Sequence, residues 1–224
     1  MTENNLLYDN LMEKINNKYS VIENSIETLM FSEHISYKST KKYLRNLHVE
    51  GQYVVQGPGE NAGIVDIGDG YCIAIRVESH NHPTFIDPYR GASTGVGGIL
   101  RDIFTMGARP IGILDFLRFG NDENSNYLLN NTISGISEYG NCFGVANVGG
   151  QCIIDPMYNK NPLVNVACLG IVKKDKIIYG NALNEESLLI YVGSKTGNEG
   201  VNGAAMASQS FDDNMDKETM KDNI

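Results

Sequence analysis

The sequence predicts an α/β or α+β fold, in which helices pack on a sheet in layers. Runs with alternating apolar residues recur along the chain, and segments with apolar residues at helical spacing separate them. Strands are expected at residues 64–67, 71–79, 109–118, 144–154 and 163–173. Helices are expected at residues 6–17, 22–31 and 127–139, and from residue 93 or 94 to just before Gly107.

Turn residues indicate where the chain reverses, and the apolar periodicity indicates which residues share a strand face. Asp69 and Gly70 stand between two alternating runs, which is typical of a hairpin turn. In the strand expected at 109–118, Ile111, Ile113 and Leu117 should share one face.

Composition places the chain among ordinary globular proteins. Of its 224 residues, 42% are hydrophobic and 20% are charged, enough for one core and part of a second. The net charge of -9 argues against a general nucleic-acid or membrane-surface role. No apolar run is long enough to span a bilayer, and the first residues lack the layout of a signal peptide. We therefore expect a cytoplasmic location.

The four cysteines are scattered and never form a C-x-x-C pair, which is not the spacing of a zinc site. We expect all of them to be reduced, small buried apolar residues: Cys72, Cys142, Cys152 and Cys168.

The stretch from Arg76 to Asp102 carries the strongest chemical signal. In the strand at 71–79, the period of two sets Tyr71, Ile73, Ile75 and Val77 on one face. It brings a cation, an anion and a titratable base together on the other: Arg76, Glu78 and His80. A charged strand face is often simply solvated, so this pattern alone leaves both interpretations open.

A glycine-rich segment follows, and we expect it to open a helix. Gly95, Gly97 and Gly98 would then lie in the first turn, where bare backbone amides suit a phosphate. Arg101 and Asp102 leave the apolar stripe of this helix and would face the same ligand. Glycines at such places also occur as plain turn residues. The two adjoining features predict a site for a phosphorylated ligand.

A second polar segment, residues 32–42, contains His34, Tyr37 and several lysines. A lone histidine is more often structural than catalytic, but this grouping would also suit anion binding or proton transfer.

The chain is expected to hold one complete domain and the beginning of another. A linker at 173–186 precedes a further strand at 188–192 and a second glycine-rich loop, which together cannot bury a core of their own. The expected division is a helical segment at 1–20, a first domain at 21–173, the start of a second domain at 187–208 and a polar tail at 209–224.

Four segments carry a resemblance to a known family: residues 32–39, 57–70, 78–120 and 161–170. From about residue 7 to residue 208 the chain resembles the N-terminal part of the phosphoribosylformylglycinamidine synthase family (synthetase subunit, PurL) of the PurM-like superfamily. The resemblance implies a PurM-like N-terminal, ATP-binding domain with a mixed or antiparallel sheet and flanking helices. A second domain of the PurM-like C-terminal type would begin after it.

The resemblance also implies an activity. In that family an ATP-dependent C–N ligase of purine biosynthesis phosphorylates the amide oxygen of formylglycinamide ribonucleotide, and ammonia derived from glutamine displaces the phosphate. Its implied cofactor is Mg2+, with ATP as a substrate. Its implied partners are a glutaminase subunit and a small bridging subunit, or a chain that supplies the missing C-terminal half.

Residue roles follow by matching the family's motifs. His34 matches an active-site residue and His80 the proton acceptor, whereas Tyr37 and Arg76 match ATP contacts. The implied magnesium ligands are Glu78 and Asp102. The implied substrate contacts are Ser79, His80, Asn81, His82 and Arg101. Carboxylates with phosphate oxygens suit Mg2+, a guanidinium suits a transferred phosphoryl group, and an imidazole can take a proton near neutral pH.

Two segments depart from the family pattern. Ile35 replaces a cysteine, and the loop at 197–204 lacks the family's arginine and histidine. The family protein is also much longer, so an N-terminal fragment or split subunit is not expected to be a competent enzyme alone. Two alternatives remain open: a non-catalytic truncated remnant, and a nucleotide-binding module that forms a homodimer through its sheet.

Overall fold

The computed structural model describes residues 46–182, 186–193 and 195. The helices expected at 6–17 and 22–31, the site residues His34 and Tyr37, and the loop at 197–204 lie outside the described residues. Within the described part of the chain, no helix is both long enough and apolar enough to cross a membrane.

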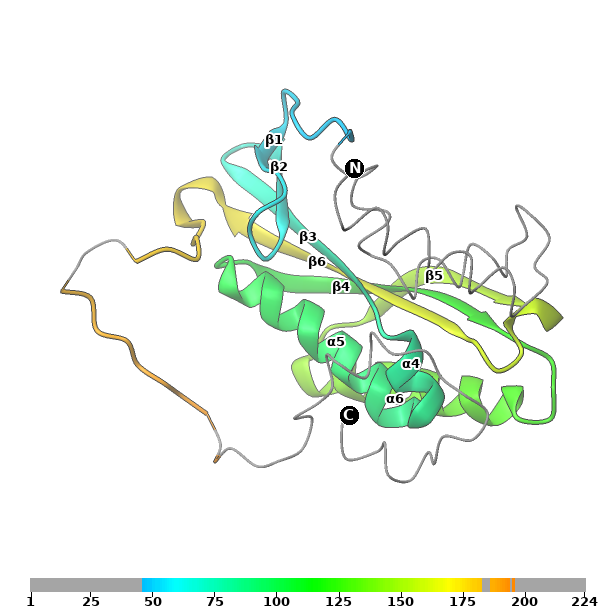
Figure 1. The fold of residues 1–224 in the computed structure, drawn as a ribbon. Helices are drawn as coiled ribbons and strands as arrows, with labels where there is room; N and C mark the ends of the chain where they lie inside the picture. Colours follow the sequence, from blue (N-terminus) through cyan, green and yellow to red (C-terminus); the bar gives the residue numbers. More distant parts are fainter. Residues whose placement is uncertain (1–45, 183–185, 194, 196–224) are drawn as a thin grey trace, which may run out of the picture. The chain divides into compact units, whose positions relative to one another are not determined.

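A six-stranded mixed sheet forms the centre of the described region (Figure 1). Its spatial order is β1-β2-β3-β6-β4-β5, and only β4 and β5 run parallel to each other. The strands are β1 (Val54–Gln56), β2 (Gly63–Gly68), β3 (Tyr71–Ser79), β4 (Arg109–Phe119), β5 (Asn147–Ile154) and β6 (Leu163–Lys173). The sequence-based prediction of a mixed sheet with flanking helices is confirmed.

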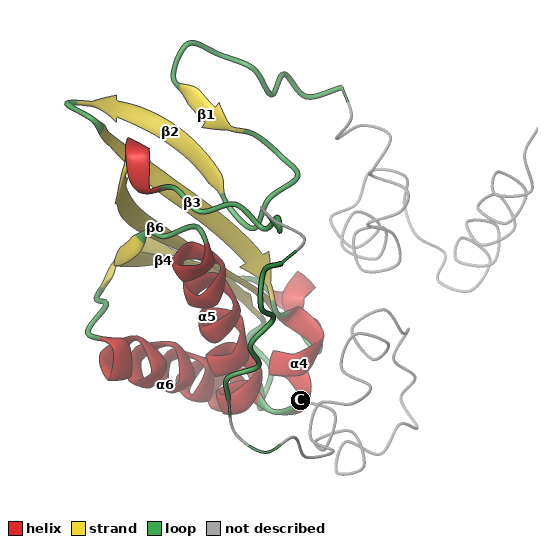
Figure 2. Cartoon of the chain, turned by 90° about the vertical axis from the view of Figure 1, so that its left-hand side faces the viewer, coloured by secondary structure: helices red, strands yellow, loops and turns green. Residues whose placement is uncertain are grey.

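In the described region, three α-helices and two short 3-10 helices lie between or after the strands. They are α4 (Asn81–Ile86), α5 (Pro88–Thr105), α6 (Ser125–Phe143), η1 (Pro156–Tyr158) and η2 (Lys174–Lys176). Figure 2 shows α4, α5 and α6 together on one side of the sheet.

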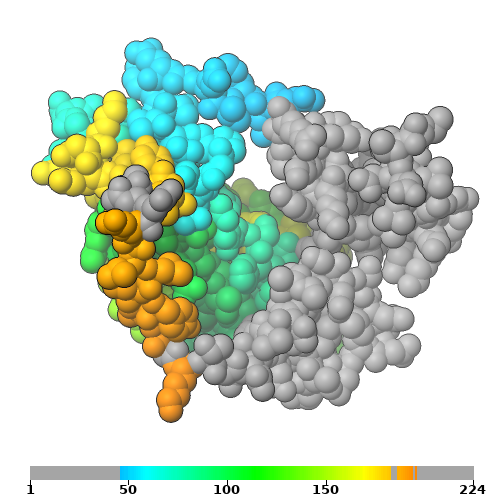
Figure 3. Space-filling view, turned by 60° about the vertical axis from the view of Figure 1, so that its left-hand side comes forward, coloured from blue at the N-terminus to red at the C-terminus, as the bar shows by residue number. Residues whose placement is uncertain are grey.

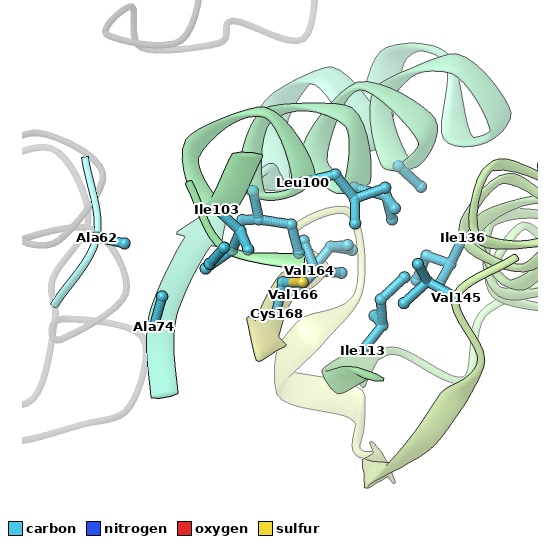
Figure 4. Close-up of a cluster of buried hydrophobic side chains, with 14 of the residues drawn as sticks. Ala62, Ala74, Leu100, Ile103, Ile113, Ile136, Val145, Val164, Val166 and Cys168 are labelled. Atoms are coloured by element: carbon cyan, nitrogen blue, oxygen red, sulfur yellow. The ribbon is translucent and has the colours of Figure 1, made fainter. Parts of the chain in front are cut away.

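The core lies between that face of the sheet and the helices. Ile103 of α5 packs over the centre of β6, where Val166 and Cys168 are fully buried (Figure 4). Ile136 of α6 meets Ile113 of β4 in the same cluster. Each such side chain contributes roughly 1.5–3 kcal/mol on burial, so this layer supplies most of the stability that holds the helices on the sheet.

The β2–β3 hairpin turns as predicted. Asp69 and Gly70 both have positive φ, 52° and 77°, which is the backbone that a tight hairpin requires. The segment after β6 closes on this hairpin: Nζ of Lys174 lies 2.6 Å from Oδ2 of Asp66, and the Lys174 amide donates to the carbonyl oxygen of Gly70. In Figure 3 this yellow segment lies against the cyan hairpin.

The helix-facing side of β3 is the one that carries the charged residues. Cys72 and Ala74 are fully buried on it, and Arg76 and Glu78 continue the same face. The apolar residues of β3 point to the other, open face of the sheet, where Ile75 and Val77 are 38% and 55% exposed. The charged face is therefore not a solvated one.

Several boundaries differ from the predictions. The glycine-rich helix begins at Pro88 and not near residue 93, because Asp87 caps it by accepting from the Arg90 amide at 3.1 Å and Pro88 fits the first turn. Ile111 is exposed and not on the face of Ile113, because the pairing of β4 with β6 shifts between residues 110 and 112.

Two further expectations were wrong. Residues 188–192 form no strand and are largely exposed, since they pair with no strand of the described region. Only Cys72 and Cys168 are buried, whereas Cys142 and Cys152 are exposed, because they lie at the end of α6 and on the exposed strand β5.

Candidate functional site

The site forms where β3 ends and α5 returns across it. β3 carries Arg76 and Glu78 on its helix-facing side, and the chain then turns through His80 into α4. After the short α4, helix α5 packs back against β3 and β6 and brings Asp102 from its C-terminal half. Among the described residues, β3 and α5 thus supply the charged groups of the site, separated by the turn at His80 and the short helix α4.

One guanidinium lies between two carboxylates. Nη2 of Arg76 is 2.9 Å from Oε1 of Glu78, and Nε of Arg76 is 2.9 Å from Oδ2 of Asp102. The three side chains are partly shielded, with 36%, 25% and 20% of their surface exposed in that order. The structure therefore brings together three residues that the sequence pattern predicted to act on one ligand.

His80 extends the cluster with a neutral imidazole. Its Nδ1 lies 3.1 Å from the carbonyl oxygen of Gly91, which can only accept, so we assign the proton to Nδ1. Its Nε2 is 3.8 Å from Oε2 of Glu78. Burial lowers the pKa of His80 below its ordinary value, against the opposing effects of the Glu78 charge and the Gly91 hydrogen bond. The imidazole is thus held ready to accept a proton at Nε2.

The glycines of α5 serve this cluster in a way that the sequence did not suggest. They lie inside the helix, because it begins earlier than expected, and so do not offer free amides to a phosphate. A Cβ at Gly95 would lie 3.1 Å from the His80 ring, and one at Gly98 would lie 2.8 Å from Oε2 of Glu78. The prediction of a glycine-rich anion cradle was wrong. These glycines leave room for the His80 and Glu78 side chains beneath the helix.

The two carboxylates fit a hard divalent cation in part. Burial raises the pKa of Asp102, and the charge of Arg76 works against that rise. In the described region no group of three or more His, Cys, Asp or Glu residues could hold a metal ion. A pair of carboxylates is nevertheless the protein share that Mg2+ takes when phosphate oxygens and water complete its coordination. Glu78 and Asp102 are therefore suited to hold Mg2+ together with phosphate oxygens and water. They are not suited to a site in which protein side chains supply every ligand.

The turn at residues 79–82 is fastened to the start of β6. The amide of Val164 donates to Oδ1 of Asn81 at 2.6 Å, and the amide of His80 donates to the carbonyl oxygen of Val164 at 2.8 Å. Oγ of Ser79 donates to Oδ1 of Asn165. The sequence analysis did not identify Asn165, because no local sequence pattern links it to Ser79, 86 residues earlier in the chain.

The remaining expected residues lie around this centre. His82 is half-buried within α4. Arg101 is exposed and borders a shallow pocket of about 360 Å³ between α5 and α6, together with Phe104 and Tyr139. Its charge works against the rise in the pKa of Asp102 that burial causes, so Arg101 acts on this carboxylate through its charge. His34 and Tyr37 lie outside the described residues.

Chemically, the site offers a guanidinium, two carboxylates and a neutral imidazole within a few ångströms. Such a set can stabilise charge on a phosphoryl group and accept a proton from a nucleophile beside it.

Comparison with known proteins gives the family. The family described as AIR synthase related protein, N-terminal domain, matches residues 59–172. The phosphoribosylformylglycinamidine synthase subunit PurL of Wolinella succinogenes is 51% identical over 92% of this chain. The chain spans 29% of the length of that relative.

Solved structures agree in fold and sequence. T. maritima PurL complexed with FGAR has a TM-score of 0.62 and 38% identity, covering 88% of this chain and 31% of the other. The same protein complexed with ATP has a TM-score of 0.56 and 40% identity, covering 76% of this chain and 28% of the other. The chain therefore belongs to the AIR synthase related family, whose N-terminal domain it contains, and within that family it is similar to PurL.

Proposed function

We propose that this chain provides the ATP- and magnesium-binding part of an enzyme that makes formylglycinamidine ribonucleotide from formylglycinamide ribonucleotide, ammonia and ATP. The observation that carries the proposal is the contact of Arg76 with both Glu78 and Asp102, beside a neutral His80. Relatives named PurL, and a PurL solved with ATP and with FGAR, support the choice of substrates.

In the proposed reaction the amide oxygen of the substrate takes the γ-phosphoryl group of ATP, which leaves ADP. Ammonia then adds to the activated carbon, loses a proton, and expels phosphate. A bound Mg2+, held by Glu78 and Asp102, would neutralise charge on the phosphates. Arg76 would contact the same phosphates, since a guanidinium binds phosphate oxygens in a fork geometry. Nε2 of His80 would take the proton from the attacking ammonia.

The turn that holds His80 is the proposed substrate contact. Ser79, Asn81 and His82 would meet the substrate along this turn, and Arg101 would bind it from α5. The oxygen of the Asn81 side chain is already used by Val164, so its amide NH2 is the group left to donate. His34 and Tyr37 would complete the site as a reactive group and an ATP contact.

Because the chain spans 29% of the W. succinogenes relative, the whole activity is proposed to need further protein. We propose that residues 21–173 form the ATP-binding domain, with a helical segment at 1–20 before it. The start of a second domain at 187–208 and a polar tail at 209–224 would follow. A glutaminase subunit, a small bridging subunit and a chain supplying the remaining part are the proposed partners, in the cytoplasm.

Reconstitution tests this function. The chain would be mixed with a separately made polypeptide covering the unmatched remainder of the W. succinogenes relative, and then given formylglycinamide ribonucleotide, ATP, Mg2+ and ammonium chloride. Amidine formation that needs both polypeptides and disappears in His80→Ala supports the proposal. A stable complex that forms no amidine and binds no ATP contradicts it.

A second candidate function is a nucleotide-binding module that forms homodimers through its sheet. It is favoured by the open face, whose apolar side chains Tyr71, Ile75 and Val77 are 38–55% exposed. The same face would suit the complementing polypeptide, so the oligomeric state of the chain alone separates the two.

A further inference from the structure

Arg76 holds together the same two carboxylates that are proposed to hold the metal. Its Nη2 contacts Glu78 and its Nε contacts Asp102, each at 2.9 Å, so one guanidinium bridges strand β3 and helix α5. The two acidic side chains thus converge on a single cation that belongs to the protein.

The guanidinium fills the space between Oε1 of Glu78 and Oδ2 of Asp102, so a metal ion bound between these two oxygens would have to displace it. Mg2+ requires carboxylate oxygens at about 2.0–2.1 Å and near-octahedral geometry, much closer than the N–O contacts that Arg76 makes. Two cations between the same oxygens would also repel each other strongly in a partly shielded site. The carboxylates therefore have alternative cationic partners.

No other described group takes over the role of Arg76. His80 lies 3.8 Å from Oε2 of Glu78, farther than Arg76 does, and its other ring nitrogen faces the carbonyl oxygen of Gly91. Arg101 acts on Asp102 through its charge, but none of the ion pairs found in the described region joins its guanidinium to an acid. Arg76 is thus the only described cation in direct contact with the pair.

We infer that Arg76 is an internal counter-cation that competes with the divalent metal and leaves the carboxylates when a metal–triphosphate complex binds. Displaced from Glu78 and Asp102, the guanidinium would find a new partner in the phosphate oxygens that arrive with the metal. Metal alone offers no such partner, so it should bind weakly, whereas metal and triphosphate should bind together. The expectation that Arg76 moves to the phosphate oxygens rests on the proposed function. The competition between Arg76 and the metal for the two carboxylates rests only on the two ion pairs.

The test uses Mn2+ alone as the probe, with the full chain at pH 7.5 and no nucleotide. Affinity would be measured by calorimetry and by the loss of the free Mn2+ electron-paramagnetic-resonance signal. We expect Arg76→Gln to bind Mn2+ about tenfold more tightly than the unmodified chain, because an opposing charge is removed. Arg76→Lys, which keeps the charge but not the two-pronged contact, should fall between the two.

Two control variants separate competition from a general change in charge. Lys176→Gln loses the same charge at a side chain that is 72% exposed, and it should leave Mn2+ affinity unchanged within twofold. In an Asp102→Asn background, the gain from Arg76→Gln should shrink, because one of the two contested ligands is gone.

A second measurement covers the case in which Arg76→Gln does not fold. In the unmodified chain labelled with 15N-arginine, the Nε–H signal of Arg76 should be protected from exchange without metal, because Nε is buried beside the Asp102 carboxylate. Saturating Mg2+ should make it exchange faster, and Mg2+ with a non-hydrolysable ATP analogue should protect it again.

Unchanged or weaker Mn2+ binding in folded Arg76→Gln would overturn the inference, as would an Arg76 Nε–H signal that Mg2+ does not alter. Failure of the proposed function looks different. In that case the unmodified chain would bind no metal–triphosphate complex, while the Mn2+ affinities of the Arg76 variants would still differ.

Discussion

Gly98 of α5 lies directly above Glu78 of β3, so close that a Cβ at position 98 would be 2.8 Å from Oε2 of the carboxylate. The atom it would meet is the far end of a flexible side chain and not the backbone. The position of this glycine therefore controls where the Glu78 carboxylate can lie, with little effect on the fold.

We predict that Gly98→Ala keeps or slightly raises stability and weakens binding of metal with nucleotide. Alanine in a helix interior is favoured over glycine by roughly 0.5–1 kcal/mol, which offsets the displacement of Glu78. Thermal unfolding and titration with Mn2+ and an ATP analogue would measure the two effects. Gly97→Ala is the matched control, because its Cβ would meet the Tyr139 hydroxyl at 2.8 Å and leave Glu78 in place. Equal binding by both variants would refute the role of Gly98.

Gly91 has a different function, since its neighbours are backbone atoms. A Cβ there would lie 2.4 Å from the carbonyl carbon of Pro83 and from the amide nitrogen of Thr84, which cannot rotate away. We predict that Gly91→Ala forces α4 and α5 apart and lowers the free energy of unfolding by about 1–3 kcal/mol. It should also disturb His80, whose Nδ1 contacts the Gly91 carbonyl. Urea unfolding would check the first effect, and an unchanged midpoint would contradict it.

These glycines show where the sequence was informative and where it was not. Alternation in β3 correctly put Arg76 and Glu78 on one face, because the pleat fixes that geometry locally, and His80 follows directly in the turn after the strand. It did not show which face the helices cover, since that depends on α5 packing from a distance. Low helix propensity made the glycines resemble a turn, whereas the real start was marked by Asp87 and Pro88.

Long-range contacts were beyond the sequence alone. The ion pair of Arg76 with Asp102 requires α5 to cross β3 at one particular height, which no local pattern specifies. Helical periodicity and motif resemblance both supplied Asp102 as a candidate, but neither indicated that Arg76 would bridge it to Glu78. The shift in β4 that exposes Ile111 likewise arises from pairing with β6 and leaves no periodic signal.

His80 predicts a pH dependence of stability with a definite sign. Burial lowers its pKa in the folded protein, so the unfolded chain binds more protons as pH falls through the ordinary value of 6.5. Its contribution to stability is therefore fully present above pH 6.5 and is lost on acidification toward the lower, folded value. Urea unfolding at pH 7.5 and 5.5, with EDTA to exclude metal, should show a larger loss for the unmodified chain than for His80→Gln. Equal losses would mean that His80 is not held neutral.

Asn165 and Ser79 predict a measurable coupling. The hydroxyl of Ser79 donates to Oδ1 of Asn165, which fixes the turn before α4 to the start of β6. We expect Asn165→Ala and Ser79→Ala each to destabilise the chain by about 0.5–1.5 kcal/mol. In a double-mutant cycle the combined variant should lose clearly less than the sum, because both changes remove one hydrogen bond. Strict additivity would show that the bond contributes nothing.

The open face of the sheet predicts self-association when no complementing polypeptide is present. Val77 lies there on β3 opposite Ala167 of β6, and it is 55% exposed within an apolar surface that also includes Ile75 and Phe116. Burying such a surface between two copies is favourable by about 25 cal/mol per Å² of apolar area, whereas a carboxylate in its centre would have to be desolvated. Sedimentation equilibrium should therefore show dimers that Val77→Glu converts to folded monomers. Ser137→Glu, on an exposed position of α6, adds the same charge and should leave the dimer intact. A monomeric unmodified chain at high micromolar concentration would refute the homodimer and leave the face to a partner of different sequence.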